Sequence, residues 1–194
     1  MLNISLLPNL FTTGNLVCGF LAILMSFYNN FFIAAILIVS AMICDSLDGR
    51  IARMVKSSSE FGVEFDSLAD LVSFGVAPAV LIFLHPNFIQ DRVVYVTVTL
   101  YVTCCALRLA RYNVQVTKSA LKNFSGLPTP ASAGLIASFI ILCSKYNYLV
   151  YNIKYISISL IVLSYLMIST IPYPSMKEFH LKEKTPFSML AFLI

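Results

Sequence analysis

Residues 31–70 read FFIAAILIVSAMICDSLDGRIARMVKSSSEFGVEFDSLAD, an apolar run followed directly by an acidic segment. The apolar run ends at Cys44 after about 14 residues, whereas a spanning helix needs about 20. The helix must therefore continue through Asp45 and Asp48. A charged group at the bilayer centre costs about 2.5–3.5 kcal/mol on insertion scales, so we expect both carboxylates to face a hydrated cavity lined by protein.

Two further aspartates follow on the next predicted helix. Asp45 and Asp48 are three positions apart and Asp66 and Asp70 are four apart, so each pair shares one helix face. The segment between the pairs reverses the chain. An antiparallel hairpin would then bring all four carboxylates to one depth, at one face of the membrane.

Four neighbouring carboxylates need positive charge between them. Two bare carboxylates 4 Å apart repel by about 4 kcal/mol at an effective dielectric constant of about 20. A set of carboxylate oxygens suits hard cations, so we expect a divalent metal, Mg²⁺ or Mn²⁺, with Ca²⁺ as a further candidate. One or two such ions held by carboxylates commonly serve phosphoryl chemistry.

The composition indicates a membrane protein. Hydrophobic residues make up 59% of the 194 residues and charged residues 11%, against roughly 25% charged in soluble domains. We predict an all-α, polytopic membrane helix bundle with about six transmembrane helices. The predicted helices span residues 11–28, 32–53, 64–84, 92–110, 130–149 and 154–172. The modest net charge of +4 fits basic loops better than a nucleic-acid surface, so no nucleic-acid partner is expected.

The basic residues predict the orientation. With a cytoplasmic N-terminus, ten of the thirteen Lys and Arg residues fall on the cytoplasmic side and three on the other. This bias follows the positive-inside rule and predicts a multi-pass protein of the bacterial inner membrane with its site facing the cytoplasm. After Lys177 to Thr185 the chain turns apolar again from Pro186 to Ile194, too short to span. This segment is either an interfacial tail or the start of a truncated seventh helix.

The acidic segment resembles the signature of the CDP-alcohol phosphatidyltransferase family. Its fixed positions, with their spacing, are Asp45-x2-Asp48-Gly49-x2-Ala52-Arg53-x8-Gly62-x3-Asp66-x3-Asp70. The resemblance covers nearly the whole chain and implies a transmembrane catalytic domain over residues 1–172, with residues 173–194 as a cytoplasmic tail. The segments LPNLFTTGNLVCGF, FDSLADLVSFGVAPA, RLARYNV and FSGLPTPASAG further resemble the branch of the family that uses serine.

The resemblance implies a role for each matching residue. Asp45, Asp48 and Asp66 would bind a first metal ion, and Asp45, Asp66 and Asp70 a second. Asp70 would also be the catalytic general base on the acceptor hydroxyl. The residues that would bind CDP-diacylglycerol are Asn9, Thr12, Asn15, Gly49, Arg53 and Ser59. A homodimer in membrane lipid is expected from the resemblance alone.

The implied reaction transfers the phosphatidyl group from CDP-diacylglycerol to L-serine and releases CMP. Arg108 and Arg111 would bind the acceptor carboxylate or the lipid phosphate, since arginine can clasp such groups through two hydrogen bonds. Equally, both could be positive-inside anchors. Two other functions stay open: a sister enzyme whose acceptor is glycerol 3-phosphate or an inositol phosphate, and a cation transporter with its site at the aspartates.

Overall fold

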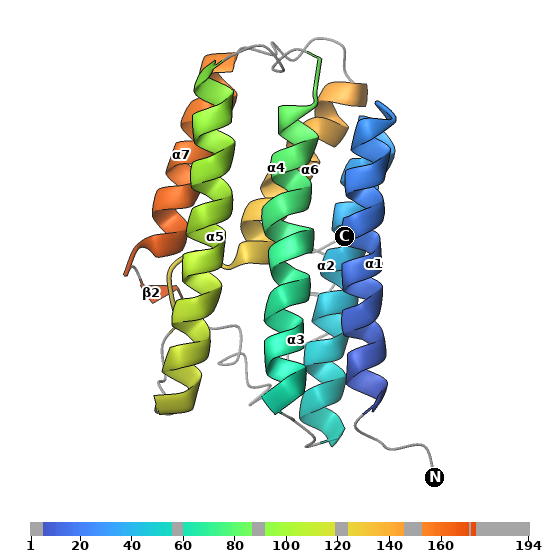
Figure 1. The fold of residues 1–194 in the computed structure, drawn as a ribbon, viewed down its shortest axis with the longest axis vertical. Helices are drawn as coiled ribbons and strands as arrows, with labels where there is room; N and C mark the ends of the chain where they lie inside the picture. The colour runs from blue at the N-terminus through green and yellow to red at the C-terminus, as the bar shows by residue number, and fades with distance from the viewer. Residues whose placement is uncertain are drawn as a thin grey trace, which may run out of the picture.

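The first two helices form an antiparallel hairpin. In the computed structural model, which describes residues 6–55, 60–86, 92–118, 124–145, 153–170 and 172–173, α1 spans Leu6–Phe27 and α2 spans Phe31–Val55. The turn between them contains Asn29 at φ 60°, a left-handed conformation that asparagine tolerates better than most residues. α1 and α2 pack along their lengths (Figure 1).

The third helical run is continuous but changes its winding. It comprises α3 (Glu60–Asp70), a π-helical turn η1 (Leu71–Val76) and α4 (Ala77–Phe83). The run lies in the middle of the bundle, between α1 and α5 (Figure 1). Its η1 turn touches α1, α5 and α6, so the wide turn is surrounded by protein.

Three further helices complete the described bundle. α5 spans Arg92–Lys118, α6 spans Thr129–Lys145 and α7 spans Ile153–Ile168. A two-residue antiparallel pair, β1 (Phe124–Ser125) and β2 (Pro172–Tyr173), joins the segment before α6 to the segment after α7. The all-α prediction is confirmed, and this small pair is the addition that the sequence did not predict.

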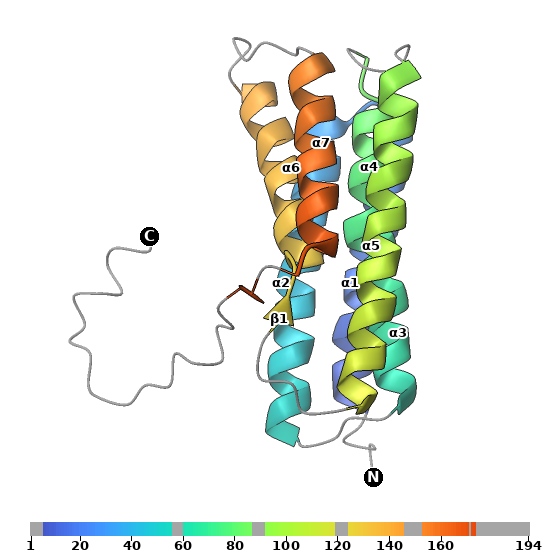
Figure 2. The ribbon, with the colours of Figure 1, turned by 90° about the vertical axis from the view of Figure 1, so that its left-hand side faces the viewer.

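The helix lengths divide the bundle into two halves. α1, α2, the α3–α4 run and α5 are each long and apolar enough to cross a membrane, whereas α6 and α7 are shorter apolar helices. Figure 2 shows α6 and α7 only in the half of the bundle that contains α4. The other half, towards the end of α2 and the start of α3, is built from the longer helices. The predicted seventh helix lies outside the described residues.

Two buried apolar clusters hold the bundle together. One lies where α5 packs against α7, around Tyr101, Leu160 and Met167. The other fills the space between α2, α4 and α6, around Ile38, Phe74 and Ile140. Both clusters touch the central α3–α4 run, through Ile82 and Phe74 respectively, which fixes that run in the bundle.

Candidate active site

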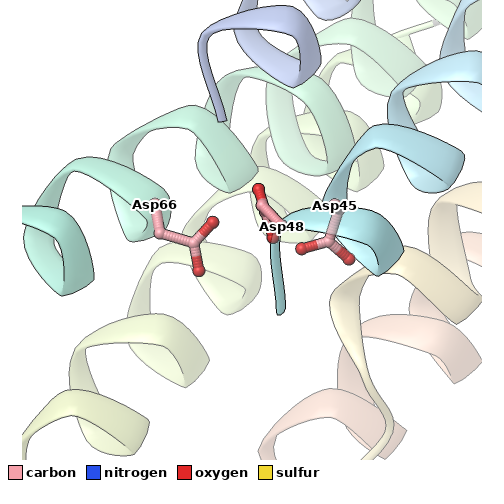
Figure 3. A group of neighbouring side chains, drawn as sticks. All are labelled: Asp45, Asp48 and Asp66. Atoms are coloured by element: carbon pink, nitrogen blue, oxygen red, sulfur yellow. The ribbon is translucent and has the colours of Figure 1, made fainter. Parts of the chain in front are cut away.

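Three carboxylates from two helices converge at one point. Asp45 and Asp48 come from the last turns of α2, and Asp66 comes from α3. Each offers one oxygen atom, and these three atoms all lie within 4.8 Å of one another. Figure 3 shows the three side chains directed towards a common space. The hairpin predicted from the spacing therefore forms, with its carboxylates facing inward.

The cluster fits a metal ion on two further observations. The Oδ1 atom of Asp66 is buried and accepts no hydrogen bond from any of the described residues. A buried carboxylate oxygen without a partner is costly, and a bound cation would satisfy it. At Gly49, directly after Asp48 in the chain, a Cβ atom would meet no atom within 4 Å among the described residues, so the space at this position is open.

The fourth aspartate stands apart from this group of three and is held by α1. Asp70 is buried at the end of α3, and its Oδ1 accepts a hydrogen bond of 3.0 Å from Nδ2 of Asn15. Asn15 is completely buried, and its own Oδ1 lacks a hydrogen-bond partner among the described residues. The sequence predicted both residues as part of the site but did not predict that they pair.

α1 contributes a second polar contact to the cluster. Thr12 is buried and its hydroxyl donates to Oδ2 of Asp48 at 3.1 Å. Asn9 lies about one turn earlier, where its carbonyl accepts the hydroxyl of Thr13 at 2.7 Å. Arg53 lies in α2, and Ser59 lies outside the described residues. Of the residues predicted to bind the nucleotide, Thr12 and Asn15 therefore directly contact the predicted metal ligands.

The two arginines of α5 have different surroundings. Arg108 is half-buried, and its Nη1 donates to the hydroxyl of Thr129, the first residue of α6, at 3.0 Å. Its Nε is buried without a partner among the described residues, and its charge interacts with those of Asp70 and Asp45. Arg111 is exposed and donates to the backbone carbonyl of Ile168, the last residue of α7, at 3.2 Å. The charge of Arg108 thus interacts with the acidic residues, whereas Arg111 caps the end of α7.

A polar chain that the sequence analysis did not single out links α3 to α5. Ser67 donates to Oδ1 of Asn113 at 3.1 Å, and Nδ2 of Asn113 donates to Oε2 of Glu64 at 3.2 Å. These bonds hold α3 against the far end of α5, one residue away from Asp66. The available signal was the position of Asn113 in the RLARYNV segment.

Fold and site together define a polytopic membrane protein with an acidic cluster suited to a divalent metal at one end of its helices. The sequence profile of the CDP-alcohol phosphatidyltransferase family matches residues 5–171, and the chain belongs to that family. The profile covers every described helix, so the acidic hairpin and the bundle that carries it are matched together.

Several curated relatives resemble the chain over most of its length. A CDP-diacylglycerol–serine O-phosphatidyltransferase of Helicobacter pylori is 38% identical over 97% of this chain and 80% of its own. The protein of the same name from Bacillus subtilis is 36% identical over 89% of this chain and 92% of its own. An archaetidylserine synthase of Methanothermobacter thermautotrophicus is 40% identical over 87% of this chain and 69% of its own.

Proposed function

We propose that the chain is a CDP-diacylglycerol–serine O-phosphatidyltransferase, an enzyme that makes phosphatidylserine and CMP. The serine hydroxyl oxygen forms a bond to the phosphorus of the phosphatidyl group. The bond from that phosphorus to the bridging oxygen of the diphosphate breaks, and CMP leaves with the bonding electrons. The names of the relatives support serine as the acceptor. The name of the archaeal relative also contains serine, although it specifies a different lipid.

The observation that carries this proposal is the convergence of Asp45, Asp48 and Asp66 within 4.8 Å. These three would hold one divalent ion, and Asp45, Asp66 and Asp70 would hold a second. Bound there, such ions would neutralise the charge of the diphosphate and of the departing CMP. We infer Mg²⁺ or Mn²⁺ from the all-oxygen ligand set, with Ca²⁺ as the further candidate.

Asp70 is the proposed general base. A serine hydroxyl is a weak nucleophile until its proton is removed, and a carboxylate within hydrogen-bond reach can accept that proton. The hydrogen bond from Asn15 fixes the orientation of the Asp70 carboxylate, and a fixed orientation raises the fraction of time spent in a reactive geometry. We propose direct attack by serine, without a phosphatidyl-enzyme; trapping such an intermediate would contradict this.

The nucleotide end of the donor would lie between α1 and the end of α2. Thr12 already contacts Asp48, and the space at Gly49, the residue after Asp48, is open among the described residues. The proposed binding residues in this region are Asn9, Thr12, Asn15, Gly49, Arg53 and Ser59. Those among the described residues lie in α1 and in the last turns of α2, and we expect the acyl chains of CDP-diacylglycerol to stay in the bilayer.

Arg108 is the proposed receptor for the serine carboxylate. Its guanidinium bears a buried Nε–H without a protein acceptor among the described residues, next to the acidic cluster. Arginine can bind a carboxylate through two parallel hydrogen bonds, which would fix serine with its hydroxyl towards Asp70. We further propose that the site faces the cytoplasm, in line with the ten-to-three distribution of basic residues, and that the enzyme is a homodimer in the bacterial inner membrane.

An assay with two acceptors tests the proposal. Purified protein is supplied with CDP-diacylglycerol and Mn²⁺, and with either radiolabelled serine or glycerol 3-phosphate. We expect CMP release and a labelled lipid with serine, and neither with glycerol 3-phosphate. Transfer to glycerol 3-phosphate alone would support a sister enzyme of the family. Absence of CMP release with any acceptor, in protein that transports divalent cations in vesicles, would contradict the enzymatic proposal.

A further inference from the structure

A proline lies in the middle of the central membrane helix. Pro78 has no backbone N–H, so it cannot donate to the carbonyl four residues earlier, that of Phe74, and its ring would collide with this carbonyl in a regular α-helix. The helix avoids the collision by widening into η1, where the N–H of Ala77 donates to the carbonyl of Val72, five residues back. The π-helical turn thus follows from the position of Pro78.

The carbonyl that loses its α-helical donor accepts a hydrogen bond from another helix. The hydroxyl of Tyr101 in α5 donates to the carbonyl oxygen of Phe74 at 2.9 Å. Tyr101 is completely buried, and its oxygen also lies 2.9 Å from Oγ of Ser132 in α6. An unsatisfied backbone group in the membrane costs several kcal/mol, so this tyrosine supplies what the proline removes.

The opposite side of the turn is held by α1. The hydroxyl of Ser73 donates to the backbone carbonyl of Asn15 at 2.9 Å. Gly19 lets the helices approach this closely, because a Cβ atom there would lie 2.6 Å from Cα of Ser73. The side chain of Asn15 in turn donates to Asp70, the residue directly before the turn. One π-helical turn is therefore fixed from both sides, immediately after the proposed base.

A widened turn changes where the residues before it point. Inserting about one residue into a helix rotates the preceding segment by about 100° relative to the segment that follows. α4 is fixed by its packing in both apolar clusters, so the turn determines the direction of Asp70 and of Asp66 before it. If the turn relaxed to a regular α-helix, these carboxylates would rotate away from Asp45 and Asp48.

We propose that Tyr101 is a positioning residue, whose hydrogen bond to the Phe74 carbonyl maintains the π-helical turn that aims Asp70 at the site. Tyr101 acts through the backbone and contacts no substrate. The inference rests on the proposed function in one respect, the role of Asp70 in the transfer reaction. Tyr101→Phe removes the hydroxyl and keeps the ring in the core, so it tests this bond with little change in packing.

The first experiment compares kcat with KM in purified Tyr101→Phe. A displacement of about 1 Å can cost about a hundredfold in rate, so we expect kcat to fall about ten- to hundredfold. The KM values for serine and CDP-diacylglycerol should stay within about twofold, because the hydrogen bond acts on orientation. Tyr165→Phe is the matched control, since it removes a hydroxyl from an exposed tyrosine of α7 and should leave kcat unchanged.

The second experiment restores the missing backbone donor. Pro78→Ala provides an N–H that can reach the carbonyl of Phe74, so the run should relax towards a regular α-helix and kcat should fall even with Tyr101 present. In this background Tyr101→Phe should lower kcat by less than about twofold more, because the two changes act on the same carbonyl. Fully additive losses would contradict the proposed coupling.

Hydrogen exchange gives a measurement that does not depend on activity. Tyr101→Phe should speed amide exchange across residues 71–79, and Tyr165→Phe should not. An unchanged kcat with a lower melting temperature, or a raised KM with unchanged kcat, would overturn the positioning role.

A second variant tests the proposal if Tyr101→Phe does not fold. Ser132→Ala removes the hydrogen-bond partner of the tyrosine hydroxyl and should lower kcat by a smaller factor than expected for Tyr101→Phe. An unaltered kcat in Ser132→Ala would overturn the proposal. Wild-type protein without serine-dependent CMP release would contradict the proposed function instead, and exchange across residues 71–79 would still decide the role of Tyr101.

Discussion

Asn15 and Asp70 are 55 positions apart in the sequence and are joined by a buried hydrogen bond of 3.0 Å from Nδ2 to Oδ1. This bond ties α1 to the end of α3, next to the three converging carboxylates of the site. Because Asn15 carries a backbone contact to Ser73 as well, it connects the acidic site with the π-helical turn behind it. The proposed base is therefore oriented by a residue of another helix.

Replacing the proposed base should abolish most of the transfer while leaving the fold intact. An asparagine at position 70 keeps an oxygen that can accept the hydrogen bond of Asn15 but cannot take a proton from serine. We expect Asp70→Asn to lower kcat by about 10²–10⁴-fold in the serine-dependent CMP release assay. Retention of kcat within about threefold, at an unchanged melting temperature, would show that Asp70 is not the base.

Removing one ligand should weaken metal binding in the absence of substrate. Mutation of a residue that hydrogen-bonds to a metal ligand typically lowers metal affinity by about 10–100-fold. Asp45→Asn removes the charge of a proposed ligand itself, so it should weaken Mn²⁺ binding by about a hundredfold, the upper end of that range. Electron paramagnetic resonance titration of the purified protein with Mn²⁺ measures this directly. Ser46→Ala is the control, since Ser46 is exposed and its hydroxyl donates to the backbone of its own helix. Equal Mn²⁺ affinity in the two variants would remove Asp45 from the metal site.

Substitution of Arg108 and of Arg111 by lysine should affect different properties of the protein. A hydrogen bond to a charged group contributes about 1.5–3 kcal/mol, so Arg108→Lys should raise the KM for serine by about ten- to a hundredfold. Arg111→Lys should affect this KM less and lower the melting temperature instead, because its contact is with the end of α7. Thr103→Ala, on the exposed face of α5, serves as the control. A larger rise in KM for Arg111→Lys would reverse the assignment.

Gly19 should not tolerate a side chain. A Cβ atom would overlap the backbone of Ser73, and forced expansion of a packed contact costs about 1–3 kcal/mol. Gly19→Ala should lower the free energy of unfolding accordingly, as measured by thermal unfolding in detergent. Gly14→Ala is the matched control on the same helix, because its Cβ would lie 3.5 Å from Sγ of Cys44, an ordinary contact distance. Equal stability of the two variants would contradict the close approach of α1 to η1.

His85 should make stability depend on pH near neutrality. Burial lowers the pKa of His85 below its usual 6.5, at the turn after α4 and against the ring of Phe31. Below pH 6.5 the unfolded chain takes up a proton that the folded chain resists, so the free energy of unfolding falls as the pH drops. Well above pH 6.5 the residue is neutral in both states and no longer affects the free energy of unfolding. The melting temperature of His85→Phe should therefore fall less than that of wild type between pH 7 and pH 5, and identical pH profiles would contradict the prediction.

The main features of the fold and the site could be predicted from sequence because they follow from local spacing. Intervals of three and four residues placed each aspartate pair on one helix face, and hydropathy located the spanning segments. The end of α5 was predicted at residue 110 but lies at Lys118, because hydropathy reports where the membrane ends and a helix can continue beyond it. The predicted end of α6 at residue 149 lies outside the described residues, in which α6 spans Thr129–Lys145.

Contacts between distant residues could not be predicted in this way. The bonds from Thr12 to Asp48 and from Asn15 to Asp70 join helices whose relative rotation depends on packing throughout the bundle. The π-helical turn did have a local signal, since a proline inside an apolar helix displaces the carbonyl four residues earlier. Tyr101, which donates to that carbonyl, had no local sequence signal. Nothing in the sequence distinguishes it from the other nine of the ten tyrosines.

The short length of α6 and α7 has a consequence for the surroundings of the reaction. At 1.5 Å per residue, 25 residues make α2 about 37 Å long, whereas 17 residues make α6 about 25 Å long. The two shorter helices therefore cannot cover the whole length of α2, and Figure 2 shows them beside only one half of the described bundle. We expect this difference in length to leave an opening on one side of the bundle, through which a donor lipid would reach the site by lateral diffusion without leaving its leaflet.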